Sequence, residues 1–101
     1  MELTWLLKFK IIRALTSGET SLLMRDDGSW YLHQSGVERK EGGCLSGGCD
    51  SGRSPEEATE QHWKWITDPK YYIVIGAMSE QRRAVRWNGF MWEDVVEEKQ
   101  C

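Results

Sequence analysis

The first apolar stretch of the chain alternates between hydrophobic and polar side chains. Hydrophobic residues occupy every second position: Leu3, Trp5, Leu7, Phe9 and Ile11. Such a period of two is typical of a β-strand with one buried face. A helix is the competing interpretation, but its apolar stripe from Leu3 through Leu7 would run into Lys10. The pattern therefore favours a strand over residues 3–12.

A hairpin is predicted over residues 21–34, around the turn sequence Asp26-Asp27-Gly28. A two-residue turn at Asp27-Gly28 would place Arg25 opposite Trp30. A three-residue loop, with Gly28 in the left-handed region, instead places Met24 opposite Trp30. The second register gathers the apolar side chains on one face: Leu22, Met24, Trp30 and Leu32. We therefore predict the second register, because it separates apolar from polar positions better.

Residues 35–53 are rich in small residues and poor in apolar ones. They include Gly36, Gly42, Gly43, Gly47, Gly48 and Gly52. This composition predicts a long flexible loop. Loops longer than about 12–15 residues are uncommon in compact domains and often carry function.

A helix start follows directly at Ser54-Pro55. Ser54 is a good N-cap, proline suits the first helical position, and Glu57 can complete a capping box. The helix is expected to end near Thr67. Its apolar face carries Ala58, His62, Trp65 and Ile66, with Trp63 at the flank of this stripe.

The last third of the chain predicts strands. Tyr71–Met78 is an apolar run typical of a central strand. Residues 82–96 form a second hairpin around Asn88-Gly89, for which a two-residue turn is expected. That turn pairs Trp87 with Phe90, Val85 with Trp92, and Arg83 with Asp94. Residues 97–101 are expected to be a frayed tail.

These elements predict a single α+β domain over residues 1–96. Its antiparallel sheet has about six strands, in the order strand-strand-strand, long loop, helix, strand-strand-strand, and one helix packs on the sheet.

Length and charge narrow the classes of function. The chain has 101 residues and a net charge of −3, so it holds one small domain without a basic nucleic-acid arm. No apolar run is long enough to span a bilayer, and Lys8, Lys10 and Arg13 interrupt the N-terminal one. We therefore expect a cytoplasmic protein that does not bind membranes. Six tryptophans are unusual in so short a chain, and tryptophan serves both cores and interfaces.

Cys44, Cys49 and His62 have the spacing of the first three ligands of a zinc-finger-like site. No fourth ligand follows, so His33 or Cys101 would have to complete the site. A cysteine nucleophile with His62 as its base is a further alternative, although a flexible loop is a poor platform for catalysis. The sequence therefore favours no metal, no cofactor and no enzymatic activity.

Arginines and aromatic residues lie close together near the second hairpin: Arg82, Arg83, Arg86, Trp87 and Tyr72. Cations with planar rings are what a nucleotide needs, for its phosphates and for its base. A nucleotide-sequestering domain is therefore the alternative function. Direct nucleic-acid binding is not expected, because the domain is net acidic.

The function favoured by the sequence is a non-enzymatic protein-binding or inhibitor module. Trp63 and Phe90 are its expected exposed anchors, and the region 35–53 contributes to its surface. Further contact residues are expected around the helix start: Arg53, Glu56, Glu57 and Glu60. Carboxylates beside tryptophan suit a partner with a basic surface. Small accessory proteins of bacteriophages have this profile, and some inhibit a host defence or nucleic-acid-processing machine by covering its surface.

Overall fold

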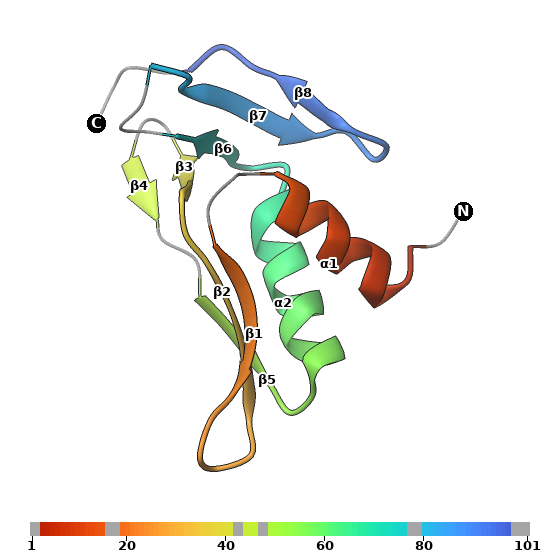
Figure 1. Cartoon of the computed structure of the whole chain (residues 1–101). Coiled ribbons are helices and arrows are strands. Elements are labelled where there is room, and N and C mark those ends of the chain that lie inside the picture. Colours follow the sequence, from red (N-terminus) through yellow and green to blue (C-terminus); the bar gives the residue numbers. More distant parts are fainter. Residues whose placement is uncertain (1–2, 16–18, 42–43, 47–48, 77–79, 98–101) are drawn as a thin grey trace.

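The computed structural model describes residues 3–15, 19–41, 44–46, 49–76 and 80–97, and the side chains of residues 41–50 lie outside that description. The described residues form an α+β domain with two helices and two antiparallel sheets (Figure 1). The helices are α1 (Trp5–Ala14) and α2 (Pro55–Thr67). The strands are β1 (Thr20–Met24), β2 (Trp30–Gln34), β3 (Val37–Glu41), β4 (Cys44–Ser46), β5 (Cys49–Gly52), β6 (Tyr72–Ile75), β7 (Arg83–Trp87) and β8 (Trp92–Asp94).

One sheet has the strand order β1-β2-β5 and the other β4-β3-β6-β7-β8. The predicted α+β class is confirmed. The chain passes from the first sheet to the second between β2 and β3, where Gly36 has a positive φ of 81°. Both helices lie on the same side of the three-stranded sheet, with α2 against β2 and β5 and α1 beside α2 (Figure 1).

The N-terminal segment is a helix, so the predicted strand over residues 3–12 is wrong. The Thr4 side chain caps α1 by accepting a hydrogen bond from the Leu7 backbone N–H at 3.2 Å. The helix turns Phe9 and the fully buried Ile12 towards the core. Lys8 shares this inner side and is tolerated because its ammonium group bonds to a carboxylate of α2. The argument against a helix failed because it took the stripe through Leu7 and Lys10 as the inner face, whereas both residues lie on the exposed side of α1.

The first hairpin has the predicted register, with Met24 opposite Trp30 and Leu22 opposite Leu32. Gly28 has a φ of 88°, as the three-residue loop requires. The Asp27 carboxylate supports the turn by accepting hydrogen bonds from the Ser29 backbone N–H at 2.9 Å and hydroxyl at 2.7 Å. These hydrogen bonds from Ser29 lower the pKa of Asp27.

The glycine-rich region 35–53 contains β3, β4 and β5, so the predicted long loop is wrong. β3 pairs with β6 and with β4, and β5 pairs with β2. The sequence does not show this, because partner strands distant in the chain stabilise segments with weak strand propensity of their own.

α2 begins and ends as predicted. Ser54 Oγ accepts a hydrogen bond from the Glu57 backbone N–H at 3.1 Å, Pro55 is the first helical residue, and Asp68 follows the end at Thr67. Its N-terminal half approaches β5 very closely at Gly52. A Cβ atom on Gly52 would lie 2.5 Å from the Ala58 backbone nitrogen.

The main core lies between the two helices and the inner faces of both sheets. Its buried members are Ile12, Leu32, Val37, Trp63, Ile66, Ile73 and Val85. The central strand predicted over Tyr71–Met78 is confirmed as the shorter β6, Tyr72–Ile75, which pairs with β3 on one side and with β7 on the other. Residues 77–78 of the prediction lie outside the described residues.

The register of the second hairpin differs from the prediction. Trp87 lies opposite Trp92, not Phe90, and Val85 lies opposite Asp94. The connection therefore has four residues, 88–91, and not two. Arg83 still bonds to Asp94, at 2.7 Å across a diagonal, but both side chains are well exposed, so the ion pair adds little stability.

The chain after β8 crosses the outer face of the five-stranded sheet. The Val95 backbone N–H bonds to the Ala84 carbonyl oxygen at 2.9 Å. Glu97, expected in a frayed tail, accepts hydrogen bonds from Lys40 Nζ at 3.0 Å and from Arg82 Nε at 2.9 Å. The expectation of fraying therefore does not hold for Glu97, and the remainder of the predicted tail lies outside the described residues.

The hydrogen bonds from Arg82 and Lys40 lower the pKa of Glu97 from 4.5 to about 2. Because this pKa is lower in the folded than in the unfolded chain, the stabilisation is fully present above pH 4.5 and is lost as the pH falls towards 2. Glu97→Gln should therefore lower the free energy of unfolding at neutral pH by about 0.5–1 kcal/mol. Urea denaturation across this pH range should show the difference from the wild type vanish near pH 2.

Candidate protein-binding surface

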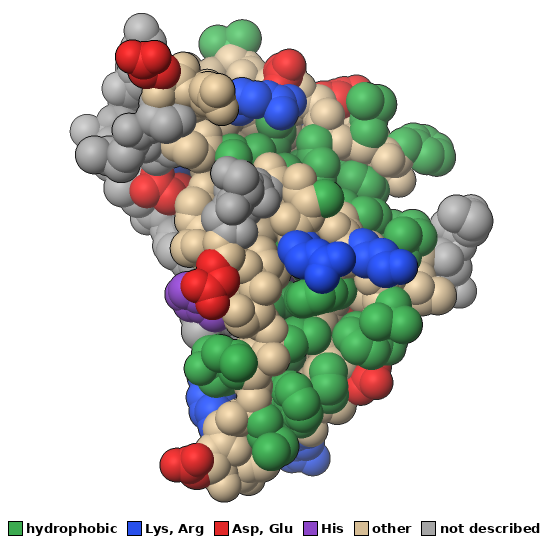
Figure 2. All heavy atoms as spheres, in the orientation of Figure 1, with side chains coloured by type: hydrophobic (Ala, Val, Ile, Leu, Met, Phe, Trp, Pro, Cys, Tyr) green, Lys and Arg blue, Asp and Glu red, His purple; other side chains and the backbone are tan. Residues whose placement is uncertain are grey.

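Large hydrophobic side chains are exposed on α1 and at the tip of the β7–β8 hairpin. The exposed fractions are 55% for Leu6, 37% for Leu7, 91% for Phe90 and 59% for Met91. Figure 2 shows hydrophobic side chains spread over the face that α1 and this hairpin share, with lysine or arginine side chains among them. We call Leu6, Leu7, Phe90 and Met91 the apolar face. Exposed patches of large apolar side chains are often interaction sites.

The tip of the hairpin is held in one conformation by Asn88. Its side-chain oxygen accepts hydrogen bonds from the backbone N–H of Phe90 at 2.8 Å and of Met91 at 2.9 Å. Its side-chain nitrogen donates to Glu93 at 2.7 Å, and its backbone N–H bonds to the Met91 carbonyl oxygen at 3.1 Å. Gly89 has a φ of 105°, which explains why glycine follows Asn88. The loop therefore displays Phe90 without the freedom of an unconstrained segment.

A cluster of three tryptophans packs between α2 and the base of this hairpin. Trp63 of α2 contacts Trp87 edge to face, with ring centroids 5.2 Å apart, and Trp87 contacts Trp92 in the same way at 5.1 Å. Such pairs add to stability beyond the area they bury. The cluster joins α2 to the base of the β7–β8 hairpin.

Trp63 is buried, with 9% of its surface exposed, so the prediction of an exposed anchor is wrong. The other tryptophans are partly buried: Trp5, Trp30, Trp65, Trp87 and Trp92. Trp63 is buried because α1 covers the flank of α2 that carries it. The prediction had a strand in place of α1, which left that flank of α2 exposed to solvent. Phe90, the second expected anchor, is exposed as predicted.

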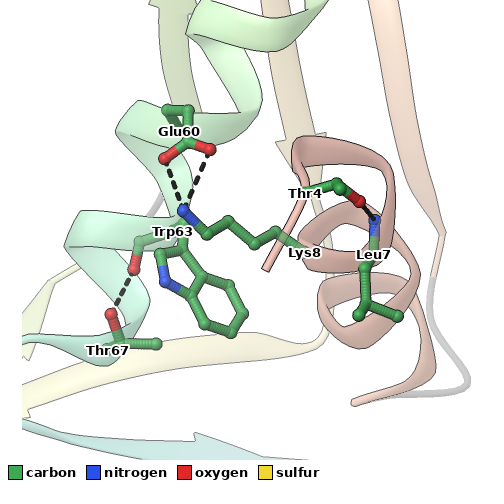
Figure 3. Close-up of polar contacts among 6 residues, drawn as sticks. All are labelled: Thr4, Leu7, Lys8, Glu60, Trp63 and Thr67. Atoms are coloured by element: carbon green, nitrogen blue, oxygen red, sulfur yellow. Dashed lines mark hydrogen bonds and ion pairs between the residues drawn. The ribbon is translucent and has the colours of Figure 1, made fainter. Parts of the chain in front are cut away.

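Glu60 bonds to Lys8 within the chain (Figure 3). The Lys8 ammonium group lies 2.8 Å and 3.0 Å from the two carboxylate oxygens and 5.8 Å from the centre of the Trp63 ring. Glu60 therefore joins α2 to α1. Glu56, Glu57 and Arg53 are exposed around the start of α2, as expected.

The residues considered for a nucleotide site make other contacts in the structure. Tyr72 is buried in a second, smaller core with Val74, and Trp87 belongs to the tryptophan cluster. Each arginine already has a partner: Arg82 bonds to Glu97, Arg83 to Asp94, and Arg86 Nε to the Tyr71 carbonyl oxygen at 3.2 Å.

His62 is fully buried and takes part in a hydrogen-bonded chain that joins three elements. Its Nε2 lies 2.8 Å from the Gln34 side-chain oxygen, and Gln34 Nε2 donates to the Ile12 carbonyl oxygen at 2.7 Å. The Gln34 contacts orient His62 between α1, α2 and β2. The side chains of Cys44, Cys49 and Cys101 lie outside the description. Among the described side chains, no three histidine, cysteine or acidic residues form a metal-binding group.

Several exposed residues in and beside the apolar face were missed by the sequence interpretation. Leu6, Leu7, Lys10 and Arg13 lie on the solvent side of α1, and Met91 lies in the hairpin loop. A helical interpretation of the first segment would have found the α1 residues, because positions 6, 10 and 13 share one helix side.

Comparison with protein-family models, with curated proteins and with solved structures found no match for this chain. None of the described helices is long and apolar enough to cross a bilayer.

Proposed function

We propose that the protein is a protein-binding module that docks through the apolar face and acts by covering a surface of its partner. The observation that carries this proposal is the display of Phe90, 91% exposed, on a loop fixed by Asn88. Exposing an aromatic side chain gives no benefit to the isolated fold. An aromatic anchor held in place before binding lowers the entropy cost of association.

The charge beside the apolar face indicates the chemistry of the partner. Lys10 and Arg13 are exposed on the same side of α1 as Leu6. A partner with an apolar centre and acidic groups at its rim complements this surface. The basic partner expected from Glu56, Glu57 and Glu60 would use the start of α2, where Glu60 is already bonded to Lys8. We therefore place the contact on α1 and the hairpin tip, and assign acidic charge to the partner.

The partner can be identified by site-specific photo-crosslinking. A photoreactive amino acid at position 90 should give one discrete crosslinked product in the native cell. The same amino acid at Val96, which is 92% exposed but outside the apolar face, is the matched control. The same products from both positions, or no product from position 90, would contradict the proposal.

Phe90→Ala should then weaken binding of the purified, identified partner about tenfold or more, as measured by calorimetry. The variant should unfold at the same denaturant concentration as the wild type, because Phe90 is exposed. Asn88→Ala should weaken binding as well, although every contact side chain remains, because the loop loses the bonds that fix it. Equal binding by all three proteins would refute the role of the tip.

A further inference from the structure

Among the described strands, β1 is an edge of the three-stranded sheet, and we infer that it pairs with β1 of a second copy of this chain. The backbone hydrogen bonds show which groups face the open side. The Arg25 N–H bonds to the Ser29 carbonyl oxygen at 2.7 Å, and the Ser35 N–H bonds to the Glu19 carbonyl oxygen at 2.9 Å. In an antiparallel pair such hydrogen-bonded positions alternate. The odd-numbered residues of β1 therefore direct their backbone N–H and C=O groups towards β2.

The even-numbered residues of β1, Thr20, Leu22 and Met24, consequently direct their backbone N–H and C=O groups away from β2. Native proteins usually protect such an edge with charged residues or proline. The sequence of β1, TSLLM, contains neither. Its exposed side chains are apolar as well, 45% of Leu23 and 62% of Met24 being accessible. The edge is therefore suited to accept another strand.

The charges next to β1 indicate that this strand comes from a second copy. In an antiparallel pair centred on Leu22, each Leu22 faces the other and Thr20 faces Met24. The same register places Glu19 opposite Arg25, twice in each dimer. Opposite charges across strands are stabilising, and like charges are destabilising. Both side chains are exposed. Within one chain Arg25 bonds to Ser51 Oγ at 3.0 Å, and Glu19 accepts a hydrogen bond from Ser21 Oγ at 3.1 Å, so both side chains would turn towards the second copy on pairing. The strand is thus complementary to itself in backbone hydrogen bonding and in charge.

The register also agrees with the faces of the sheet. Paired residues of antiparallel strands point to the same side, so both Leu22 side chains remain on the core side, where Leu22 already packs. The two three-stranded sheets become one six-stranded sheet with α2 of both copies on one side (Figure 1). Pairing covers Leu23 and Met24 but does not use Phe90 or Leu6. The dimer is therefore independent of the proposed function.

Charge exchange tests both the pairing and its register. Sedimentation equilibrium under reducing conditions should show a concentration-dependent dimer of the wild type. Glu19→Lys and Arg25→Glu should each weaken dimerisation roughly tenfold or more, because each replaces two attractive pairs with two repulsive ones. The double variant Glu19→Lys/Arg25→Glu should restore the wild-type constant to within about threefold, since it restores opposite charges.

A second variant separates pairing from folding. Met24→Pro removes an N–H that points to the open edge, a position at which edge strands tolerate proline, and should abolish the dimer while circular dichroism remains unchanged. Thr67→Ser, remote from β1, is the control and should dimerise as the wild type does. A wild type that stays monomeric up to about 1 mM would overturn the inference. Equal dimerisation by all charge variants would overturn it as well, and so would a dimer that persists in a folded Met24→Pro variant.

Discussion

Trp63→Ala is expected to lower the free energy of unfolding by about 3–5 kcal/mol, the usual cost of deleting a buried aromatic side chain. Trp63 contacts Trp87 edge to face and lies under the Lys8 ammonium group, so its removal affects α1, α2 and the β7–β8 hairpin together. A small domain is stabilised by only about 5–15 kcal/mol in total. The variant should therefore lose a large part of its stability.

Urea denaturation followed by circular dichroism measures this effect. Phe90→Ala is the matched control, because it also truncates an aromatic side chain but at an exposed position, and it should change the free energy of unfolding by less than about 0.5 kcal/mol. An unchanged midpoint for Trp63→Ala would contradict its burial. The prediction also has a practical consequence: loss of partner binding by Trp63→Ala would report loss of the fold, and only Phe90→Ala tests the surface.

Gly52→Ala is the second substitution with a large expected effect. Its Cβ atom would lie 2.5 Å from the Ala58 backbone nitrogen and 2.8 Å from the Glu57 carbonyl carbon. These atoms belong to the backbone of α2 and cannot rotate away as a side chain can. Either α2 must move from β5 or the strand must shift, and overpacking of this kind costs about 1–3 kcal/mol or more.

Gly28 provides the comparison, because glycine is favoured there by the backbone conformation and not by a lack of space for a side chain. It has a φ of 88°, and an added Cβ would meet no atom within 4 Å. Gly28→Ala should cost about 1 kcal/mol, and Gly28→Asn less, since asparagine tolerates positive φ. At Gly52 asparagine should be worse than alanine, because it is larger. If thermal unfolding ranks the two asparagine variants equally, the clash with α2 is not the reason for glycine at position 52.

Much of the fold follows from local signals in the sequence. The ends of α2 were predicted correctly because Ser54, Pro55 and the Asp68-Pro69 pair act on their immediate neighbours. The register of the first hairpin was predicted because Gly28 and the alternation of Leu22 and Met24 act within a few residues. Strand β6 was recognised from its own apolar run, and the exposure of Phe90 from its place at a hairpin tip.

Most of the errors involve a partner distant in the sequence. A carboxylate 52 residues away makes Lys8 acceptable on the inner side of α1, and no local pattern contains that information. Strands β3 and β5 form because β6 and β2 offer them backbone partners. The second hairpin has a four-residue loop, although Asn88-Gly89 locally favours a two-residue turn. Trp87 and Trp92 pair at the base of this loop, and Trp87 packs against Trp63.

The six tryptophans show the same division most clearly. The sequence by itself determined that the chain has an excess of large aromatic side chains on an α+β framework with a helix from Pro55 to Thr67. Only the tertiary structure decided that Trp63 is buried and that Phe90, Leu6 and Leu7 are exposed. Helix propensity and turn chemistry act over a few residues, whereas burial depends on which elements meet. Here one helix, α1, covers the flank of another and thereby determines which side chains remain exposed.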